Sequence, residues 1–352
     1  CCYRSVVRAA ADRAIGLFGS RWSASDAMSR MGKTGHGKLG LAQDMSATVT
    51  PSGMPLDPRR NQSIGNLVCM ASMMVWAAGF PAAEILLKTW DPLALIAARF
   101  CVAVLVLVVV WLALEGGRAV LGAPWIKGAR IGGLAFGLGA WLLLVAQAAT
   151  DAVTVSIIAA AVPIAAVLIE IFTEGRRLNW RLGVGLLASV LGGIIASGAG
   201  SGSAALSASA LWGVGAAVLS CFLFAWGSHR SVLGLPDVSA LGRTTVTLAG
   251  GLVVTGVLFL AGHFVGLVPL PQGALQGQAL SLLGIYAIGG MALSQFLWII
   301  SVARLGVGLA SFHINVAPFY VMLIFLALGQ GWSWPQAIGA AIVALGVIVA
   351  QR

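Results

Sequence analysis

The stretch AAAVPIAAVLI, residues 159–169, recurs later in the chain as INVAPFYVMLI, residues 314–324. In both places a polar break of similar length follows the proline, and a Gly-rich apolar run comes after the break. The glycines of each run stand seven residues apart, at Gly185 and Gly192 and again at Gly339 and Gly346. The chain therefore carries one pattern of landmarks twice.

Long apolar runs separated by short polar breaks fill the chain from about Ile64 onward. Mean hydropathy is +0.96, and only 9% of the residues are charged, against about 25% in soluble domains. One membrane span takes roughly 20 apolar residues, so this part of the chain leaves no room for a soluble enzyme domain. The expected spans are 64–87, 92–114, 129–149, 152–173, 181–198, 207–228, 239–262, 279–301, 307–329 and 335–350.

Each half of this pattern contains five spans, and a tryptophan followed by small residues lies near its start, Trp76-Ala-Ala-Gly and Trp226-Gly-Ser. Because five is odd, the second unit must enter the membrane from the side opposite to the first. The sequence therefore predicts an all-α polytopic membrane protein with ten transmembrane helices in two inverted five-helix repeats. Such repeats are typical of secondary transporters, whose substrate site lies at the repeat interface near mid-membrane.

Four segments follow from this division. Residues 63–198 and 207–352 form the first and second five-helix repeats, and the uncharged Gly/Ser-rich segment 199–206 links them. Residues 1–62 are rich in Arg, Ser and Gly, and we expect a basic, disordered tail. Two other interpretations stay open for this segment. Translation starts later, at Met28, Met31 or Met45, or the segment is an organellar transit peptide.

Basic residues predict the orientation, because cytoplasmic loops collect Lys and Arg. With the N-terminus inside, every basic residue falls on the inner side except Lys88, which is outside, and Arg99, which is within the second span. We therefore expect both termini in the cytoplasm and a location in the inner (plasma) membrane. The net charge of +10 follows from this topology, and no basic–aromatic module indicates nucleic-acid binding.

Two stretches resemble a known family: MMVWAAGFPAAEILL, residues 73–87, and DPLALIAARF, residues 91–100. Together with Pro163 and Pro318 in the fourth and ninth spans, they are similar to EamA-type permeases of the drug/metabolite transporter superfamily. The resemblance covers about residues 64–351. It implies two inverted five-helix repeats, a central cavity between them, and export of small metabolites by alternating access.

Family members often have a glutamate where each proline-containing helix ends. In this chain the second-half counterpart is Gln330, and the first-half counterpart is either Glu174 or Arg176.

Charged residues inside the spans are candidates for gating or coupling, because a charge in the bilayer core is costly. Glu84 near the outer end of the first span either pairs with Lys88 or acts as a titratable gate beside Pro81. Arg99 either forms an ion pair with Glu84 or Asp91 or recognises an anion. Glu170 belongs either to an ion pair at the inner gate or to the coupling machinery.

His313 and Asn315 precede Pro318 by about a turn, where a proline frees a backbone carbonyl. Interrupted helices of this kind often supply ligands in transporters. The alternative for His313 is a helix-packing role, with its side chain satisfied by a neighbour. A metal site is not expected, because no second His or Cys stands at suitable spacing, and no cofactor motif is present.

Uncharged polar side chains in corresponding spans are further candidates for substrate binding: Gln147 on the third span and Ser294 and Gln295 on the eighth. They either hydrogen-bond between helices or recognise a zwitterion or heterocycle. Four tryptophans well inside spans either fill space or wall a cavity for flat or cationic solutes. These are Trp76, Trp141, Trp226 and Trp298.

Glycines in two further places suggest packing or motion. Gly133 and Gly137 form a small-xxx-small face that lets helices approach closely. Gly289 and Gly290 in the eighth span either act as a hinge or serve packing.

The sequence thus predicts an exporter of small neutral or zwitterionic metabolites, amino acids or similar compounds, that works by alternating access. Proton antiport through Glu84 or His313 and uncoupled transport are both open. The expected partners are a small-molecule substrate and the lipid bilayer, and a homodimer is compatible with the sequence. A passive channel and an integral membrane enzyme are the competing classes. No Ser/His/Asp set, HExxH motif or paired intramembrane carboxylate supports an enzyme.

Overall fold

The computed structural model describes residues 58–174, 180–196, 208–271 and 276–351. The chain divides into two units, Cys1–Gly65 and Asn66–Arg352. In the first unit the described residues, 58–65, are the helical start of α3. The predicted tail, the linker 199–206 and Arg176 lie outside the described residues.

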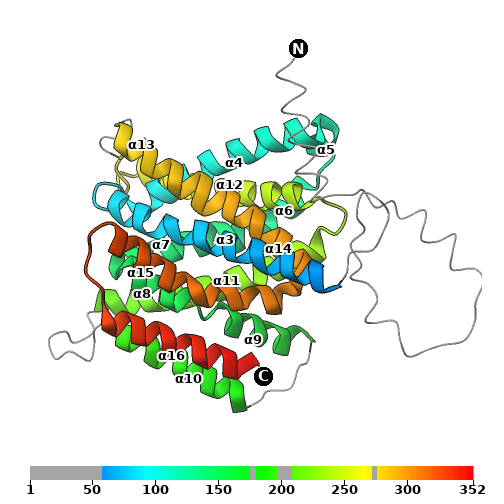
Figure 1. Cartoon of the computed structure of the whole chain (residues 1–352). Helices are drawn as coiled ribbons and strands as arrows, with labels where there is room; N and C mark the ends of the chain where they lie inside the picture. The colour runs from blue at the N-terminus through cyan, green and yellow to red at the C-terminus, as the bar shows by residue number, and fades with distance from the viewer. Residues whose placement is uncertain (1–57, 175–179, 197–207, 272–275, 352) are drawn as a thin grey trace, which may run out of the picture. The chain divides into compact units, whose positions relative to one another are not determined.

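All regular elements among the described residues are helices, which confirms the all-α class (Figure 1). The first part of the chain contains α3 (Pro58–Leu86), α4 (Pro92–Glu115), α5 (Gly117–Leu121), α6 (Trp125–Gly132), η1 (Gly133–Leu138), α7 (Gly139–Ala149), α8 (Ala152–Ala159), α9 (Val162–Glu174) and α10 (Trp180–Ala196). The second part contains α11 (Ala208–Gly234), α12 (Ala240–Phe264), α13 (Gly277–Gly284), η2 (Ile285–Leu293), α14 (Ser294–Ser311), η3 (Phe312–Val316), α15 (Ala317–Ala327) and α16 (Trp334–Gln351).

Seven helical segments among the described residues are long and apolar enough to cross a membrane. They are Arg59–Leu86, Pro92–Glu115, Trp125–Ala149, Ala152–Ile169, Leu211–Gly234, Ala240–Phe264 and Gly277–Leu305. Two shorter apolar helical stretches follow, Phe312–Ala327 and Trp334–Gly346. The chain is therefore a multi-pass membrane protein.

Polar residues at the breaks start several helices. Asp91 accepts a hydrogen bond from the backbone N–H of Leu93 at 2.7 Å, with Pro92 at the first helical position of α4. Asp151 caps α8 by accepting from Val153 N and Thr154 N, each at 2.9 Å. Such caps satisfy N–H groups that have no partner inside the helix.

Irregular backbone interrupts three of the long segments and begins one of the shorter stretches. The segment Trp125–Ala149 contains the π-helical turn η1, and the segment Gly277–Ser311 contains the longer π-helical turn η2. The helix pair α8/α9 breaks at residues 160–161, and the 3₁₀ turn η3 precedes α15. Pro163 and Pro318 each stand second in the helix that follows the break. Because proline has no N–H to donate, it is tolerated in a first helical turn.

The Gly-rich helices α10 and α16 lie side by side (Figure 1). A Cβ atom added to Gly192 would lie 2.6 Å from the carbonyl oxygen of Gly339, and one added to Gly346 would lie 3.2 Å from that of Gly185. The glycines that repeat in the sequence therefore face one another. The hydrophobic effect does not drive helices together in lipid. The van der Waals packing that this close backbone approach allows therefore stabilises the pair.

Gly133 and Gly137 also allow a close approach, as the sequence predicted. Added Cβ atoms at these positions would lie 2.8 Å from Val254 Cγ2 and 2.9 Å from the Cα of Gly251. η1 therefore packs directly on α12.

Candidate functional site

A cavity of about 90 Å³ lies within the helix bundle. It is large enough for several water molecules, or for part of a small solute. Two clusters of buried apolar residues meet at it: Met73 and Trp298 belong to one, and Phe100, Phe136 and Met291 to the other. Its lining comes from α3, α4, η1, α7, α8 and α9 in the first part of the chain and from α11, α12, η2, α14 and η3 in the second.

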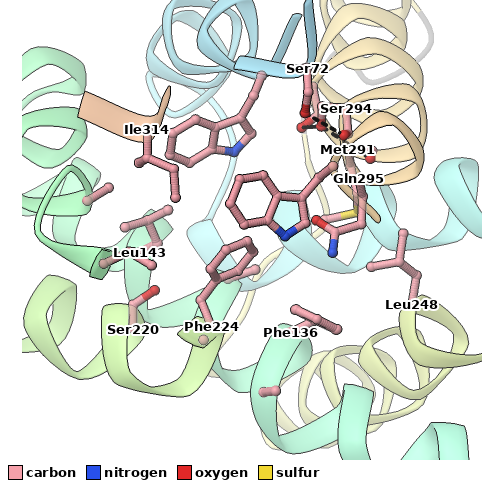
Figure 2. A pocket seen from close by; sticks show the side chains of 18 of the residues that line it. Ser72, Phe136, Leu143, Ser220, Phe224, Leu248, Met291, Ser294, Gln295 and Ile314 are labelled. Carbon is pink, nitrogen blue, oxygen red and sulfur yellow. Dashed lines mark hydrogen bonds between the residues drawn. The ribbon is translucent and has the colours of Figure 1, made fainter. Parts of the chain in front are cut away.

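Apolar side chains form most of the wall. Phe136, Leu143, Phe224, Leu248 and Ile314 surround one space in Figure 2. The rings of Phe224 and Trp298 lie 6.0 Å apart, and those of Phe136 and Phe224 lie 5.8 Å apart in an edge-to-face arrangement. Both separations are typical of favourable aromatic pairs. The wall therefore suits the apolar part of a solute.

Arg99 is the one charged residue among the described residues that line this cavity. It is 7% exposed. Its Nε donates to the carbonyl oxygen of Tyr286 at 3.1 Å, and Nη2 donates to that of Gly290 at 2.7 Å. The guanidinium also lies 3.8 Å from the centre of the Tyr286 ring. α4 thus holds a cation against the irregular turn η2.

The expected ion pair of Arg99 with Glu84 or Asp91 is wrong for the described part of the chain. Glu84 Oε2 instead accepts from the backbone N–H of Ala152 at 2.8 Å, and Asp91 caps α4. Carbonyl oxygens of η2 replace the carboxylate because this turn brings them within reach of the guanidinium. Among the described residues, the hydrogen bonds of Arg99 therefore go to neutral carbonyl acceptors.

Two donors on α14 are buried without a hydrogen-bond partner, Gln295 Nε2 and Trp298 Nε1. Both residues line the cavity, and a spacing of three residues places them on one helix face. Trp298 is only 2% exposed. Burying a donor without a partner costs about 1–3 kcal/mol, so these groups are available for a ligand.

Serines join α3 to α14 at the same cavity. Ser72 Oγ donates to the carbonyl oxygen of Ser294 at 2.8 Å, and Ser294 Oγ donates to that of Gly290 at 2.8 Å (Figure 2). Gly290 O thus accepts from both Ser294 and Arg99. These bonds fix the position of the η2 backbone relative to the cation.

The structure brings four of the substrate-binding candidates and one charged candidate to this cavity: Trp76, Ser294, Gln295, Trp298 and Arg99. Gln147 lines a smaller adjoining pocket together with Trp76, Arg99 and Tyr286. Its Nε2 donates to the carbonyl oxygen of Phe80 at 2.8 Å, so its amide group also joins α7 to α3.

Four other candidates lie outside the cavity lining. Trp141 packs, partly buried, against one of the apolar clusters. Trp226 lines a different pocket, with Lys127, Arg130 and Arg230. His313 and Asn315 belong to η3, where His313 Nδ1 and Asn315 Oδ1 are buried without a partner.

Glu84 lines a separate pocket with Asp151, Gln330 and Gln336. Gln336 Nε2 donates to Asp151 Oδ1 at 3.2 Å, which connects α16 to the start of α8. The side chain of Glu170, on α9, lies outside the described residues.

Several lining residues were missed from the sequence: Ser72, Phe136, Ser220, Phe224 and Tyr286. Two of these had a usable signal. Ser72 precedes Trp76 by four residues and so shares its helix face, and Ser220 precedes Phe224 by the same spacing. Nothing in the sequence distinguished Phe136 from the other aromatic residues of apolar runs.

Among the described residues no group of three or more His, Cys, Asp or Glu side chains is placed to hold a metal ion.

Comparison with solved structures finds a likeness over most of the chain. One structure, described only as "Crystal structure of protein", superposes with a TM-score of 0.60 and 22% sequence identity, over 82% of this chain and 96% of that chain. At this identity the likeness concerns the fold alone. No curated protein matches the chain.

A family model matches the first part of the chain. The model of the EamA-like transporter family covers residues 63–198, which include α4, with Arg99, and the first-half wall of the cavity. Residues 63–198 of this chain therefore match the EamA-like transporter family, which is a family of membrane transporters.

Proposed function

We propose that the chain is a secondary transporter that exports small neutral or zwitterionic metabolites, amino acids or compounds of similar size, by alternating access. The observation that carries the proposal is a cavity whose wall comes from both parts of the chain. Secondary transporters bind substrate between their repeats and expose it by rocking one repeat against the other. A mostly apolar wall with a few convergent polar groups is typical of a small-molecule site.

The ten-helix inverted repeat is part of this proposal. Corresponding features support it: π-helical turns in the third and eighth predicted spans, and a helix break before Pro163 and Pro318 in the fourth and ninth. The fifth and tenth predicted spans, α10 and α16, pack on one another through their glycines. Such correspondence is expected when one five-helix unit occurs twice.

Within the cavity the proposed substrate contacts are Trp76, Ser294, Gln295 and Trp298, with Gln147 behind them. Trp141, Trp226, His313 and Asn315 lie outside the lining in this conformation. Their proposed contacts with substrate therefore belong to other conformations that alternating access requires. Arg99, Glu84 and Glu170 remain the proposed charged residues for gating or coupling.

The membrane orientation belongs to the proposal as well: an inner-membrane protein with both termini in the cytoplasm. Two pockets support it. Glu84, Asp151, Gln330 and Gln336 come from breaks or span ends assigned to the outer side, and they gather in one pocket. Lys127, Arg130 and Arg230 come from segments assigned to the inner side, and they gather in another.

Efflux from cells preloaded with labelled amino acids, nucleosides and sugars tests the transporter. The expected result is selective loss of one solute class, with acceleration by unlabelled external solute. The Trp298→Ala, Gln295→Ala double variant removes an indole and an amide from the cavity, so we expect efflux to fall at least about tenfold. A matched control is the Trp334→Ala, Gln278→Ala double variant, because Trp334 and Gln278 are exposed outside the cavity.

The competing classes make different predictions in this assay. A passive channel gives efflux without saturation and without acceleration by external solute, and an integral membrane enzyme gives no efflux above empty-vector cells. Either result, or equal losses in the two double variants, contradicts the proposal. For proton coupling, the same assay is run with an imposed pH gradient. Transport that is still driven by pH in a Glu84→Gln, His313→Gln variant removes both residues from the coupling mechanism.

A further inference from the structure

We propose that the cavity selects solutes by a carboxylate group, which Arg99, Gln295 and Trp298 hold, and that an amino group on the solute is not required. This inference rests on the proposed function and revises its substrate class to small solutes with one carboxylate and an apolar body, which are zwitterionic if they are amino acids and anionic if they have no amine.

The first argument is charge. Arg99 lies at the cavity with its Nε and Nη2 on two neutral carbonyl oxygens. No Asp or Glu is among the described residues that line the cavity. A buried cation without a carboxylate partner is costly in a low-dielectric site. A solute carboxylate at Arg99 would remove this cost.

The second argument is the supply of donors. Gln295 Nε2 and Trp298 Nε1 are buried at the same cavity without partners. An ionised carboxylate has two oxygens that accept about four hydrogen bonds and donate none. An arginine together with two further N–H donors suits a carboxylate, because hydrogen bonds to an ionised acceptor are stronger than those between neutral groups. These two N–H groups cannot accept a hydrogen bond from an ammonium group, and the acceptor that Gln295 also carries is a neutral amide oxygen.

The third argument concerns the remainder of the solute. The other polar lining residues are neutral, among them Ser72, Ser220 and Ser294. Ser72 and Ser294 already donate to backbone carbonyls. The rest of the wall is apolar or aromatic, with Phe136, Phe224 and Leu143 facing the space (Figure 2). The lining thus offers no formal negative charge to a solute ammonium, whereas it accommodates a hydrocarbon or aromatic body.

Four compounds that share one skeleton test this inference on the purified full chain in detergent. 3-Phenylpropanoate has the carboxylate alone, phenylalanine has carboxylate and amine, phenethylamine has the amine alone, and 3-phenylpropanamide has neither charge. We measure how each compound raises the melting temperature as its concentration increases, since a ligand that binds the folded state stabilises it. Both carboxylates should stabilise the protein, and the amine and the amide should not.

Variants assign the effect to the named groups. Trp298→Phe removes one N–H donor and should weaken apparent 3-phenylpropanoate binding about tenfold. Gln295→Glu places a carboxylate in the cavity and should abolish that binding. Trp90→Phe is the matched control, because Trp90 Nε1 is also buried without a partner but Trp90 does not line the cavity. Arg99→Lys keeps the positive charge but removes the planar guanidinium. It therefore separates the effect of guanidinium geometry from the effect of charge.

Equal stabilisation by phenethylamine and 3-phenylpropanoate overturns the inference, as does stabilisation by none of the four compounds. Equal effects of Trp298→Phe and Trp90→Phe also overturn it. Efflux and counterflow in cells are separate measurements, so the two proposals fail separately. A solute that is exported with saturable counterflow but binds equally well as its amide leaves the transporter intact and removes the carboxylate selectivity.

Discussion

Two neighbouring glycines on η2 differ sharply in their surroundings. A Cβ atom added to Gly290 would lie 3.0 Å from the Cα of Gly79 and 3.4 Å from Nη2 of Arg99. A Cβ atom added to Gly289 would meet only Cγ1 of Val75, at 3.6 Å, which is an ordinary contact. Gly290 therefore serves close packing of α3 on η2 beside the cation.

We therefore expect Gly290→Ala to destabilise the protein by about 1–3 kcal/mol, because backbone atoms of α3 must move away. It should also weaken solute binding, since the carbonyl oxygen that holds Arg99 moves with the helix. Gly289→Ala should leave stability unchanged or raise it slightly. Melting temperatures in detergent check both variants, and a greater loss in Gly289→Ala than in Gly290→Ala would contradict this assignment.

At the scale of elements, the contact of α10 with α16 depends on glycines that let the two backbones meet. Gly346→Leu would force four side-chain carbons into the space beside Gly185. We expect a lower melting temperature, corresponding to about 1–3 kcal/mol or more. The control is Gly183→Leu, because an added Cβ on Gly183 of α10 meets nothing within 4 Å. Equal melting temperatures for the two variants would show that the helix pair does not need this close approach.

The irregular turns are the elements for which the sequence carried the least signal. Pro163 and Pro318 indicated where the fourth and ninth segments are interrupted, since proline cannot donate within a helix. No residue of η1 or η2 predicts a π-helical turn. Such turns depend on how neighbouring helices press on the segment, and they are frequent at functional sites. Here η2 supplies both carbonyl oxygens that hold Arg99.

At the scale of the whole molecule, the proposed orientation predicts which loops face the cell exterior. In a chain whose five cysteines are replaced, Gly331→Cys should react with a membrane-impermeant maleimide in intact cells. Asp237→Cys should react only after permeabilisation. Both positions are exposed in the structure, so accessibility depends on the side of the membrane. The opposite pattern of labelling would invert the orientation. Labelling of both positions from outside would contradict the odd number of spans predicted between them, 239–262, 279–301 and 307–329.

The sequence by itself determined the all-helical membrane class and the approximate positions of the helices, because apolar run length and polar breaks act locally along the chain. It also singled out Trp76, Gln295 and Trp298, since polar and large aromatic groups inside apolar helices are conspicuous. Only the tertiary structure decided that these residues share a cavity with Arg99, whereas Trp141 and Trp226 do not line it. It also gave Arg99 carbonyl partners in place of a carboxylate. The physical reason is that a side chain's partners depend on which distant helix packs against it. Arg99 and Gly290 are 191 residues apart in the chain, and no local pattern records their contact.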